Sequence, residues 1–215
     1  MPTDMGERAV CTRYVLGWSA RVYRRRSWHA IHCAVARLWL GFLRLLFRFG
    51  AWHASAPYSC RAYKKMVVEL ANALHPAVAV EVGCGLGDII SRVKAVERVG
   101  IDLDANVIRA ARFLHWRGRW IQGDSSRVLQ LQQRRIDCLI MVNWIHCLSP
   151  DELAALLLPL LPITRYLILD AIDADGPCSY RYKHDFGFLA AATQRVRTVR
   201  APDEPRSFAV LEVLQ

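Results

Sequence analysis

A carboxylate, a glycine-rich turn and two further carboxylates follow the apolar segments of this 215-residue chain at regular intervals. The first segment, Val80-Glu81-Val82, runs into Gly83-Cys84-Gly85-Leu86-Gly87-Asp88. A strand that enters such a turn brings backbone N–H groups next to a ligand, and Gly83 and Gly85 leave no side chain between backbone and ligand. Asp88 stands where a dinucleotide fingerprint has its third glycine, which argues against NAD or FAD. A carboxylate at Glu81 suits a ligand with positive charge.

The two further carboxylates end the next apolar segments. Asp102, in Val99-Gly100-Ile101-Asp102-Leu103-Asp104, follows Gly83 by 19 residues. An acid at the end of a second strand, at about this spacing, accepts hydrogen bonds from a ribose diol. Asp124 ends the segment Trp120-Ile121-Gln122-Gly123-Asp124-Ser125. Each acid alone is explained as a helix N-cap or a solvated loop residue, but their order at successive strand ends predicts a nucleoside site.

The elements that must position these residues alternate between short β-branched runs and helical patterns. Such alternation predicts a parallel sheet with helices on both faces. We expect strands over 77–82, 99–103, 119–122, 138–143, 165–171, 196–200 and 207–214, and helices over 60–74, 87–96, 105–114, 126–131, 150–158 and 183–194. A turn with two prolines joins the last two strands, so the predicted α/β fold is a Rossmann-like, doubly wound, seven-stranded sheet that is mostly parallel and ends in an antiparallel hairpin.

Residues 58–215 resemble the class I S-adenosylmethionine-dependent methyltransferases through EVGCGLG, GIDLD, QGDSS and DCLIMVNWIHCL. The resemblance implies an enzyme of this class with S-adenosyl-L-methionine as its cofactor. It implies that Glu81 and the turn residues Gly83, Cys84, Gly85 and Gly87 line the methionine part. It also places Asp102 at the ribose hydroxyls, Leu103 and Ser125 beside the adenine, Asp124 at the adenine amino group and Asn143 near the transferred methyl.

Methyl transfer to a hydroxyl group needs a general base, whereas an amine acceptor does not always need one. The candidates are His146, Asp170 and the pair His184 and Asp185, which all follow strand ends. We expect His184 to be the base, oriented by Asp185, with His146 as the second candidate. The simpler alternatives are a helix cap, a packed histidine or a solvated loop residue. Asn143-Trp144-Ile145-His146 has no prolines, unlike family members that methylate nucleobase amines.

The net charge of +10 lies wholly in residues 1–65, which carry twelve Lys and Arg against two Asp and Glu. We therefore divide the chain into a basic amphipathic helical extension, residues 1–57, and a methyltransferase domain, residues 58–215. In residues 24–49 a basic stripe borders a wide apolar face, which is typical of a helix in an anionic membrane interface. Packing on the body or on a second subunit would bury the same face. Because the motifs lie beyond residue 80, we expect the extension to be unnecessary for cofactor binding.

The residue composition bears on three further questions, which are disulfide bonding, metal binding and membrane crossing. Seven cysteines without a C-x-x-C pair indicate reduced thiols in the cytoplasm and no disulfide scaffold. His29, His32 and Cys33 have no fourth ligand at a usual spacing, so no metal site is predicted. Because Arg37, Arg44 and Arg48 interrupt the best apolar run, we expect no membrane-spanning helix.

Three hypotheses follow for the function. The first is methyl transfer to a small-molecule, saccharide or lipid-linked acceptor by a cytoplasmic protein held peripherally at the membrane. The second is an RNA methyltransferase that uses its basic segment for phosphate contacts; the neutral body argues against nucleic acid as the partner. The third is a non-catalytic, cofactor-binding scaffold. The sequence leaves the acceptor and the oligomeric state open.

Overall fold

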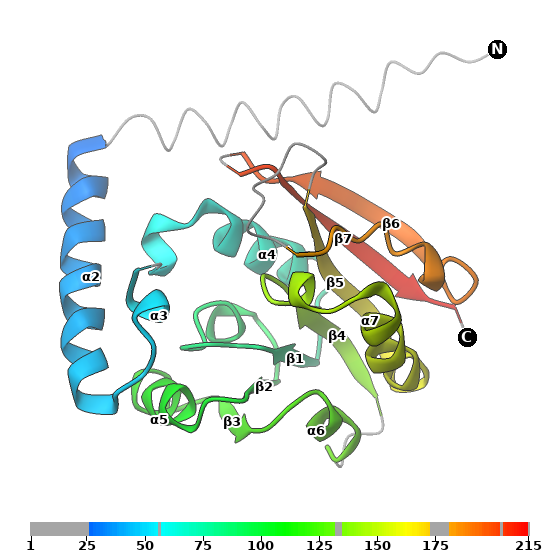
Figure 1. The fold of residues 1–215 in the computed structure, drawn as a ribbon, viewed down its shortest axis with the longest axis horizontal. Coiled ribbons are helices and arrows are strands. Elements are labelled where there is room, and N and C mark those ends of the chain that lie inside the picture. Colours follow the sequence, from blue (N-terminus) through cyan, green and yellow to red (C-terminus); the bar gives the residue numbers. More distant parts are fainter. Residues whose placement is uncertain (1–25, 56, 132–134, 173–180, 203, 215) are drawn as a thin grey trace.

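A seven-stranded mixed sheet forms the centre of the protein, as seen in a computed structural model that describes residues 26–55, 57–131, 135–172, 181–202 and 204–214 (Figure 1). The strand order is β3-β2-β1-β4-β5-β7-β6. Strands β1 to β5 pair in parallel, whereas β7 pairs antiparallel with both β5 and β6. This order confirms the predicted doubly wound sheet and its antiparallel C-terminal hairpin.

The elements agree with most of the predicted ranges. The strands are β1 (Val78–Val82), β2 (Glu97–Asp102), β3 (Arg119–Gln122), β4 (Ile136–Met141), β5 (Thr164–Ile172), β6 (Thr193–Arg200) and β7 (Arg206–Val213). The α-helices are α2 (Arg26–Phe47), α3 (Ala51–Ser55), α4 (Ala62–Ala73), α5 (Ala105–Leu114), α6 (Ser126–Leu129) and α7 (Pro150–Leu157). Short 3-10 turns span Tyr58–Cys60, Ile90–Arg92, Ile145–Cys147, Leu158–Ile163 and Gly187–Leu189.

Two predicted helices are wrong. In place of a helix over 87–96 the chain forms only the turn Ile90–Arg92, because Gly87 is left-handed and Val93 is already extended. In place of a helix over 183–194 the chain forms the turn Gly187–Leu189 and then enters β6. Phe186 is buried in a left-handed conformation (φ 62°), which no helix continues. Tertiary burial overrides the local helical pattern at this position.

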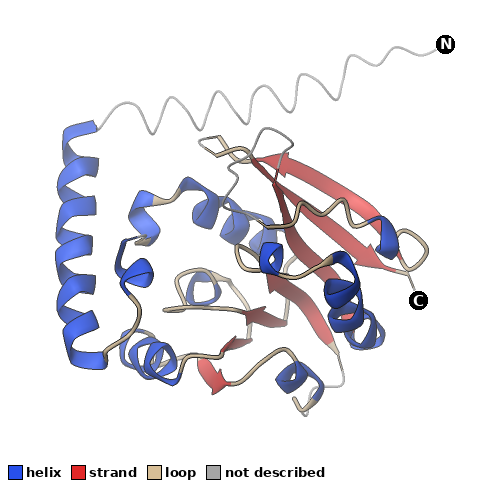
Figure 2. Cartoon of the chain, viewed as in Figure 1, coloured by secondary structure: helices blue, strands red, loops and turns tan. Residues whose placement is uncertain are grey.

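Apolar clusters cover both faces of the sheet, and helices surround it (Figure 2). Leu153 and Leu157 of α7 and Val128 of α6 pack on one face. Val67 of α4 and Ile108 of α5 pack on the other. The two clusters hold the carboxyl ends of the parallel strands in fixed relative positions, which is what a site at that edge requires.

The long helix α2 lies along the outside of this body (Figure 1). Leu40 and Leu43 of α2 are buried against Leu86, Val107 and Ala110, so one face of the helix packs on the body. A disulfide joins Cys33 of α2 to Cys60 beside α4. The prediction that the thiols are reduced is therefore wrong for this pair, because the fold brings two cysteines 27 residues apart into contact.

The prediction that no segment could cross a membrane is also wrong. His29–Phe47 is long and apolar enough to do so by length and composition alone, because Arg37 and Arg44 are too few to exclude it. This finding is weak by itself, since core helices and signal sequences share these properties. The buried contacts of Leu40 and Leu43 show that one face of this helix is already covered by protein.

Candidate functional site

The predicted motifs meet where the strand order reverses. From β1 the connections lead outward in one direction to β2 and β3, and from β4 they lead in the other direction to β5. Ligands of open α/β sheets bind outside the carboxyl ends of the strands at such a switch point. Glu81 at the end of β1 and Asn143 after β4 stand on its two sides and line one pocket.

The glycine-rich loop is anchored to the neighbouring strand. The backbone N–H groups of Gly83 and Cys84 donate to the carbonyl oxygen of Ile101, at 2.8 and 3.0 Å. Gly83, Gly85 and Gly87 all have positive φ values, between 53° and 78°. Residues other than glycine rarely adopt this backbone conformation. The side chain of Cys84 points into the core, where its burial raises the thiol pKa, so this residue offers only its backbone to a ligand.

The space beside these glycines is occupied by protein side chains. A side chain at Gly83 would collide with the indole of Trp144, whose Nε1 donates to the Val82 carbonyl at 2.7 Å. A side chain at Gly87 would collide with Trp120. The backbone of Gly83 lines the pocket at the switch point, and its missing side chain also makes room for Trp144.

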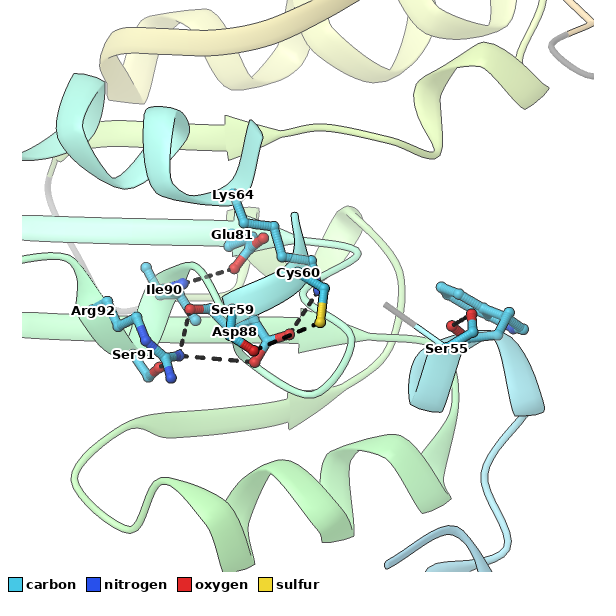
Figure 3. A network of polar contacts seen from close by, with 10 residues as sticks. Ser55, Ser59, Cys60, Lys64, Glu81, Asp88, Ile90, Ser91 and Arg92 are labelled. Atoms are coloured by element: carbon cyan, nitrogen blue, oxygen red, sulfur yellow. Dashed lines mark hydrogen bonds and ion pairs between the residues drawn. The ribbon is translucent and has the colours of Figure 1, made fainter. Parts of the chain in front are cut away.

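Glu81 is a buried carboxyl group inside the fold. It is 3% exposed, and its Oε2 accepts the backbone N–H of Ile90 at 3.0 Å. Burial raises its pKa to about 8, although the Ile90 hydrogen bond opposes this shift. Lys64 lies nearby and donates to Asp88 at 2.6 Å, as Figure 3 shows. The carboxyl group of Glu81 is therefore poised to ionise when a positively charged group approaches.

Asp102 connects two parts of the site. Its Oδ2 accepts the N–H of Gly85 at 2.8 Å, and its Oδ1 accepts the N–H of Asp104 at 3.0 Å. These bonds orient the carboxylate at the end of β2, and it remains half-buried. Each oxygen has a further lone pair. A vicinal diol is the ligand group that uses two such acceptors together.

A second pocket lies beyond Asp102, lined by Leu103, Gln122, Gly123, Asp124, Ser126, Arg127 and Gln130. The side chain of Leu103 is exposed and apolar, which suits the face of an aromatic ring. Asp124 is exposed, and its Oδ1 accepts from the backbone and hydroxyl groups of Ser126. These bonds hold the pKa of Asp124 below its usual range. Ser125 lies at the start of α6 and does not line this pocket.

The pocket at the switch point includes four residues that the sequence motifs do not indicate. They are Trp52 and His53 of α3 and Tyr63 and Lys64 of α4. They precede the first strand, where no motif marks them. Their positions depend on how α3 and α4 fold back over the glycine-rich loop, which no local pattern in the sequence reports.

A buried charged cluster supports Asn143. The backbone N–H of Asn143 donates to both carboxylate oxygens of Asp170 at 3.0 Å, and its Oδ1 accepts from Arg206 Nη1 at 3.1 Å. Arg206 also lies 3.2 Å from Asp170, and both side chains are at most 3% exposed. His146 Nε2 lies 3.1 Å from the same carboxylate. Asp170 thus joins three elements beneath the pocket, and it holds Asn143 in its left-handed conformation (φ 77°).

The pair His184 and Asp185 separates in the structure. His184 is buried and its Nε2 donates to the carbonyl oxygen of Ile145 at 3.1 Å. Burial lowers its pKa, opposed by that carbonyl group. The exposed Asp185 side chain instead accepts the N–H of Gly187 at 2.9 Å. The rings of His184 and His146 are stacked, with centroids 5.9 Å apart. The fold therefore brings the two histidines together, whereas the Asp185 side chain bonds to Gly187 and not to His184.

The described side chains include no group of three or more His, Cys, Asp or Glu residues that could hold a metal ion. The polar side chains at the site include instead carboxylates, which accept hydrogen bonds, and one lysine, which donates them. Buried Glu81 suits a cationic centre, and Asp102 suits a diol. The apolar Leu103 surface beside Asp124 suits a purine ring with an amino group. This set of groups fits S-adenosyl-L-methionine.

Comparison with known proteins supports this interpretation. A family model described as a methyltransferase domain matches residues 79–162, which include the glycine-rich loop, Asp102, Asp124 and Asn143. No curated protein matches this sequence.

Solved methyltransferase structures share the fold. One is magnesium protoporphyrin IX methyltransferase (ChlM) from Synechocystis PCC 6803 with bound SAH. It superposes with a TM-score of 0.59 at 14% sequence identity, and the match covers 71% of this chain and 84% of that chain. Another is the N-methyltransferase NodS from Bradyrhizobium japonicum WM9 in complex with S-adenosyl-l-homocysteine. Its TM-score is 0.61 at 12% sequence identity, and the match covers 71% of this chain and 86% of that chain. A third is the mitomycin 7-O-methyltransferase MmcR. Its TM-score is 0.57 at 13% sequence identity, and the match covers 76% of this chain and 57% of that chain. At such identities the likeness concerns the fold.

Proposed function

We propose that this chain is a class I S-adenosylmethionine-dependent methyltransferase and that it methylates a small-molecule, saccharide or lipid-linked acceptor at a membrane surface. The observation that carries the membrane part is the exposed apolar face of α2. The observation that carries the small acceptor is the compactness of the body, because the described connections between its strands hold single helices and short turns and no added substrate domain.

The cofactor supplies, when bound, a methyl group on a positively charged sulfur. In our proposal Glu81 ionises and offsets that positive charge or the charge of the adjacent ammonium group, and the glycine-rich loop lines the methionine part. Asp102 accepts the ribose hydroxyl groups. Asp124 and Leu103 hold the adenine from its edge and its face, with Ser125 beside it. The role of these residues is to align the methyl group with the acceptor, since positioning supplies much of the rate in such displacements.

The acceptor side lies at the ends of β4 and β5. Asn143 is exposed and lines the pocket, and the Arg206 bond occupies its amide oxygen, so its Nδ2 group can donate to an acceptor oxygen. We keep His184 as the proposed base for a hydroxyl acceptor, since burial favours its neutral form. His146 is the second candidate, because its contact with Asp170 resembles the carboxylate–histidine pairs of general bases. The Asp185 side chain orients neither histidine ring, since it accepts the backbone N–H of Gly187 in the turn that follows.

The exposed side of α2 supports membrane binding. Its outward apolar residues are each 47% to 79% exposed: Ile31, Val35, Leu38, Trp39, Phe42, Leu45 and Leu46. Single exposed apolar residues are ordinary, but a continuous stripe along one helix marks an interaction surface. Arg37 and Arg44 lie at its border and are exposed, which suits anionic lipid headgroups. We propose that α2 lies in the interface of an anionic membrane on the cytoplasmic side, without crossing it.

Vesicle binding tests the membrane part. We expect the full chain to co-sediment with phosphatidylglycerol-containing vesicles and to dissociate only in part at high salt, since the apolar contribution is not screened. Changing Arg37, Arg44 and Arg48 to Glu should abolish binding, whereas the same change at Arg117, Arg135 and Arg181 on the body should not. Changing Leu38 and Leu45 to Ser should weaken the part that survives high salt. Dimers in solution with no vesicle binding would assign the face to a second copy of the chain.

Transfer of a labelled methyl group tests the acceptor class. We expect label from S-adenosylmethionine to enter an acceptor in a screen of small hydroxyl, amine and carboxyl compounds and of lipid extracts. Label in RNA would favour the alternative that the basic segment holds a nucleic acid. Cofactor binding with no transfer to any class would favour the scaffold alternative.

A further inference from the structure

We propose that His53, on the short helix α3, is a cofactor-binding residue and that α3 forms a wall of the pocket at the switch point. None of the sequence motifs includes α3. The inference rests on cofactor binding, and it does not depend on the membrane part of the proposed function.

His53 lies directly on the glycine-rich loop. A Cβ atom built at Gly85 would be only 3.2 Å from His53 Nδ1, so the imidazole covers this glycine at van der Waals distance. The side chain is 8% exposed although it belongs to a five-residue surface helix. Together with Trp52 it lines the same pocket as Glu81, Lys64 and Asn143.

The helix that carries His53 is held in place from several sides. Trp52 stacks on the imidazole, with ring centroids 3.4 Å apart, and Phe49 meets it edge-on at 6.0 Å. The backbone N–H of His53 donates to the Gly50 carbonyl, and Ser55 Oγ donates to the Trp52 carbonyl at 2.7 Å. Just before α3, Phe49 is buried in the cluster that attaches α2 to the body. Phe49 therefore anchors the start of α3 to the body, and the contacts within residues 49–55 order the helix itself.

The chemistry around His53 suits the amino-acid end of the cofactor. Burial lowers the pKa of His53, opposed by the nearby carboxylates of Asp102 and Asp104, and Lys64 adds to the lowering. A neutral imidazole has one N–H donor and one acceptor nitrogen. Glu81 and the Lys64–Asp88 pair all line the pocket, so a ligand group that carries both an ammonium and a carboxylate finds side chains of both signs there. His53 can hydrogen-bond to either of them.

The position of α3 argues against the expectation that residues before the first motif are unnecessary for cofactor binding. The glycine-rich loop and its acids lie beyond residue 80, but Trp52 and His53 complete the same pocket from the segment before residue 57. Removal of residues 1–56 would therefore open the pocket on one side. In our proposal the extension is part of the cofactor site.

Calorimetric titration of the full chain with S-adenosylhomocysteine tests the proposal without an acceptor. We expect His53→Ala to weaken binding about tenfold or more, which corresponds to about 1.4 kcal/mol. His53→Gln, which keeps a donor and an acceptor, should stay within about threefold of the wild type. His32→Ala is the matched control, because His32 is exposed on α2 and does not line the pocket. Thermal unfolding without ligand should show that the variants are folded.

The possible failures are distinguishable. If the wild type binds S-adenosylhomocysteine and His53→Ala binds equally well or more tightly, His53 does not contact the cofactor, and the proposal is overturned. If the wild type does not bind at all, the assignment of the cofactor itself fails. If His53→Ala does not fold, His53→Ser and Trp52→Ala decide, since Trp52 is 63% exposed. Weakened binding in both variants would support the role of α3, and unchanged affinity in both would overturn it.

Discussion

Replacement of Glu81 by glutamine should make the stability of the protein less sensitive to pH. The carboxyl group is 3% exposed and its pKa is raised by burial from 4.5 to about 8. A carboxyl group whose folded pKa is raised stabilises the fold fully below its unfolded pKa. That contribution falls as the pH rises from about 4.5 and is lost above about 8. A glutamine side chain would keep an oxygen for the Ile90 N–H group but would have no proton to lose.

The size of the effect follows from the two pKa values. Between pH 5 and pH 8 the wild type should lose roughly 3–4 kcal/mol that the variant does not lose, at about 1.4 kcal/mol per pH unit over most of this range. Urea unfolding of both proteins at several pH values measures the difference. The free energy of unfolding of Glu81→Gln minus that of the wild type should rise with pH and level off above pH 8.

Above the unfolded pKa of Glu81, folding takes up a proton at this carboxyl group, and cofactor binding should release part of it again. If Glu81 ionises against a cationic ligand group, binding near pH 7 releases a proton. The observed enthalpy then depends on the ionisation enthalpy of the buffer, and this dependence should vanish in Glu81→Gln. A stability difference that is flat from pH 5 to pH 8 would refute the reasoning, because it would mean that Glu81 is ionised in the free protein.

Three further perturbations test other parts of the site. Asp102→Ala should weaken S-adenosylmethionine binding by about 1.5–3 kcal/mol, measured by calorimetry, because it removes a charged acceptor of two hydroxyl groups; an unchanged dissociation constant would sink this assignment. His184→Ala should lower turnover by roughly 10²–10⁴-fold with little change in cofactor affinity if the acceptor is a hydroxyl, and a change of only a few-fold would place the base elsewhere. Arg206→Met should cost about 3–5 kcal/mol in urea unfolding, since it leaves the Asp170 carboxylate buried without its guanidinium partner; a loss under about 1 kcal/mol would mean that the two groups do not pair in solution.

Most of the sheet could be predicted from the sequence because parallel strands and their helices have strong local signatures. The ranges 105–114 and 119–122 agree with α5 and β3 at both ends. In each case a carboxylate or a glycine marks the boundary, as Asp104 does when it caps α5 through Asn106 and Val107. The spacing from the glycine-rich loop to Asp102 reflects one strand–turn–strand unit, and for this reason an acid that binds a ribose could be predicted. The cofactor itself was implied by the resemblance of the four motifs to the methyltransferase family.

The two predicted helices that do not form show where such signatures fail. Residues 183–194 have a helical pattern, but burying His184, Phe186 and Leu189 requires an irregular path, and β7 then pairs with the chain from Thr193 onward. Local preference amounts to tenths of a kcal/mol per residue, whereas burial of a large side chain contributes more. The tertiary term decides when the two conflict.

The amphipathic pattern of α2 indicated that this helix must bury an apolar face, and the order of Glu81, Gly83, Asp102 and Asp124 predicted a nucleoside site. Only the tertiary structure decided which face of α2 meets the body, that Cys33 reaches Cys60, and that His53 covers Gly85. It also decided that Arg206, 63 residues after Asn143, donates to the side-chain oxygen of Asn143 and pairs with Asp170. Motif residues act within one strand and its following turn, so their spacing is written in the sequence. Contacts between distant segments depend on how helices and strands pack, and their residue types carry no mark of the partner.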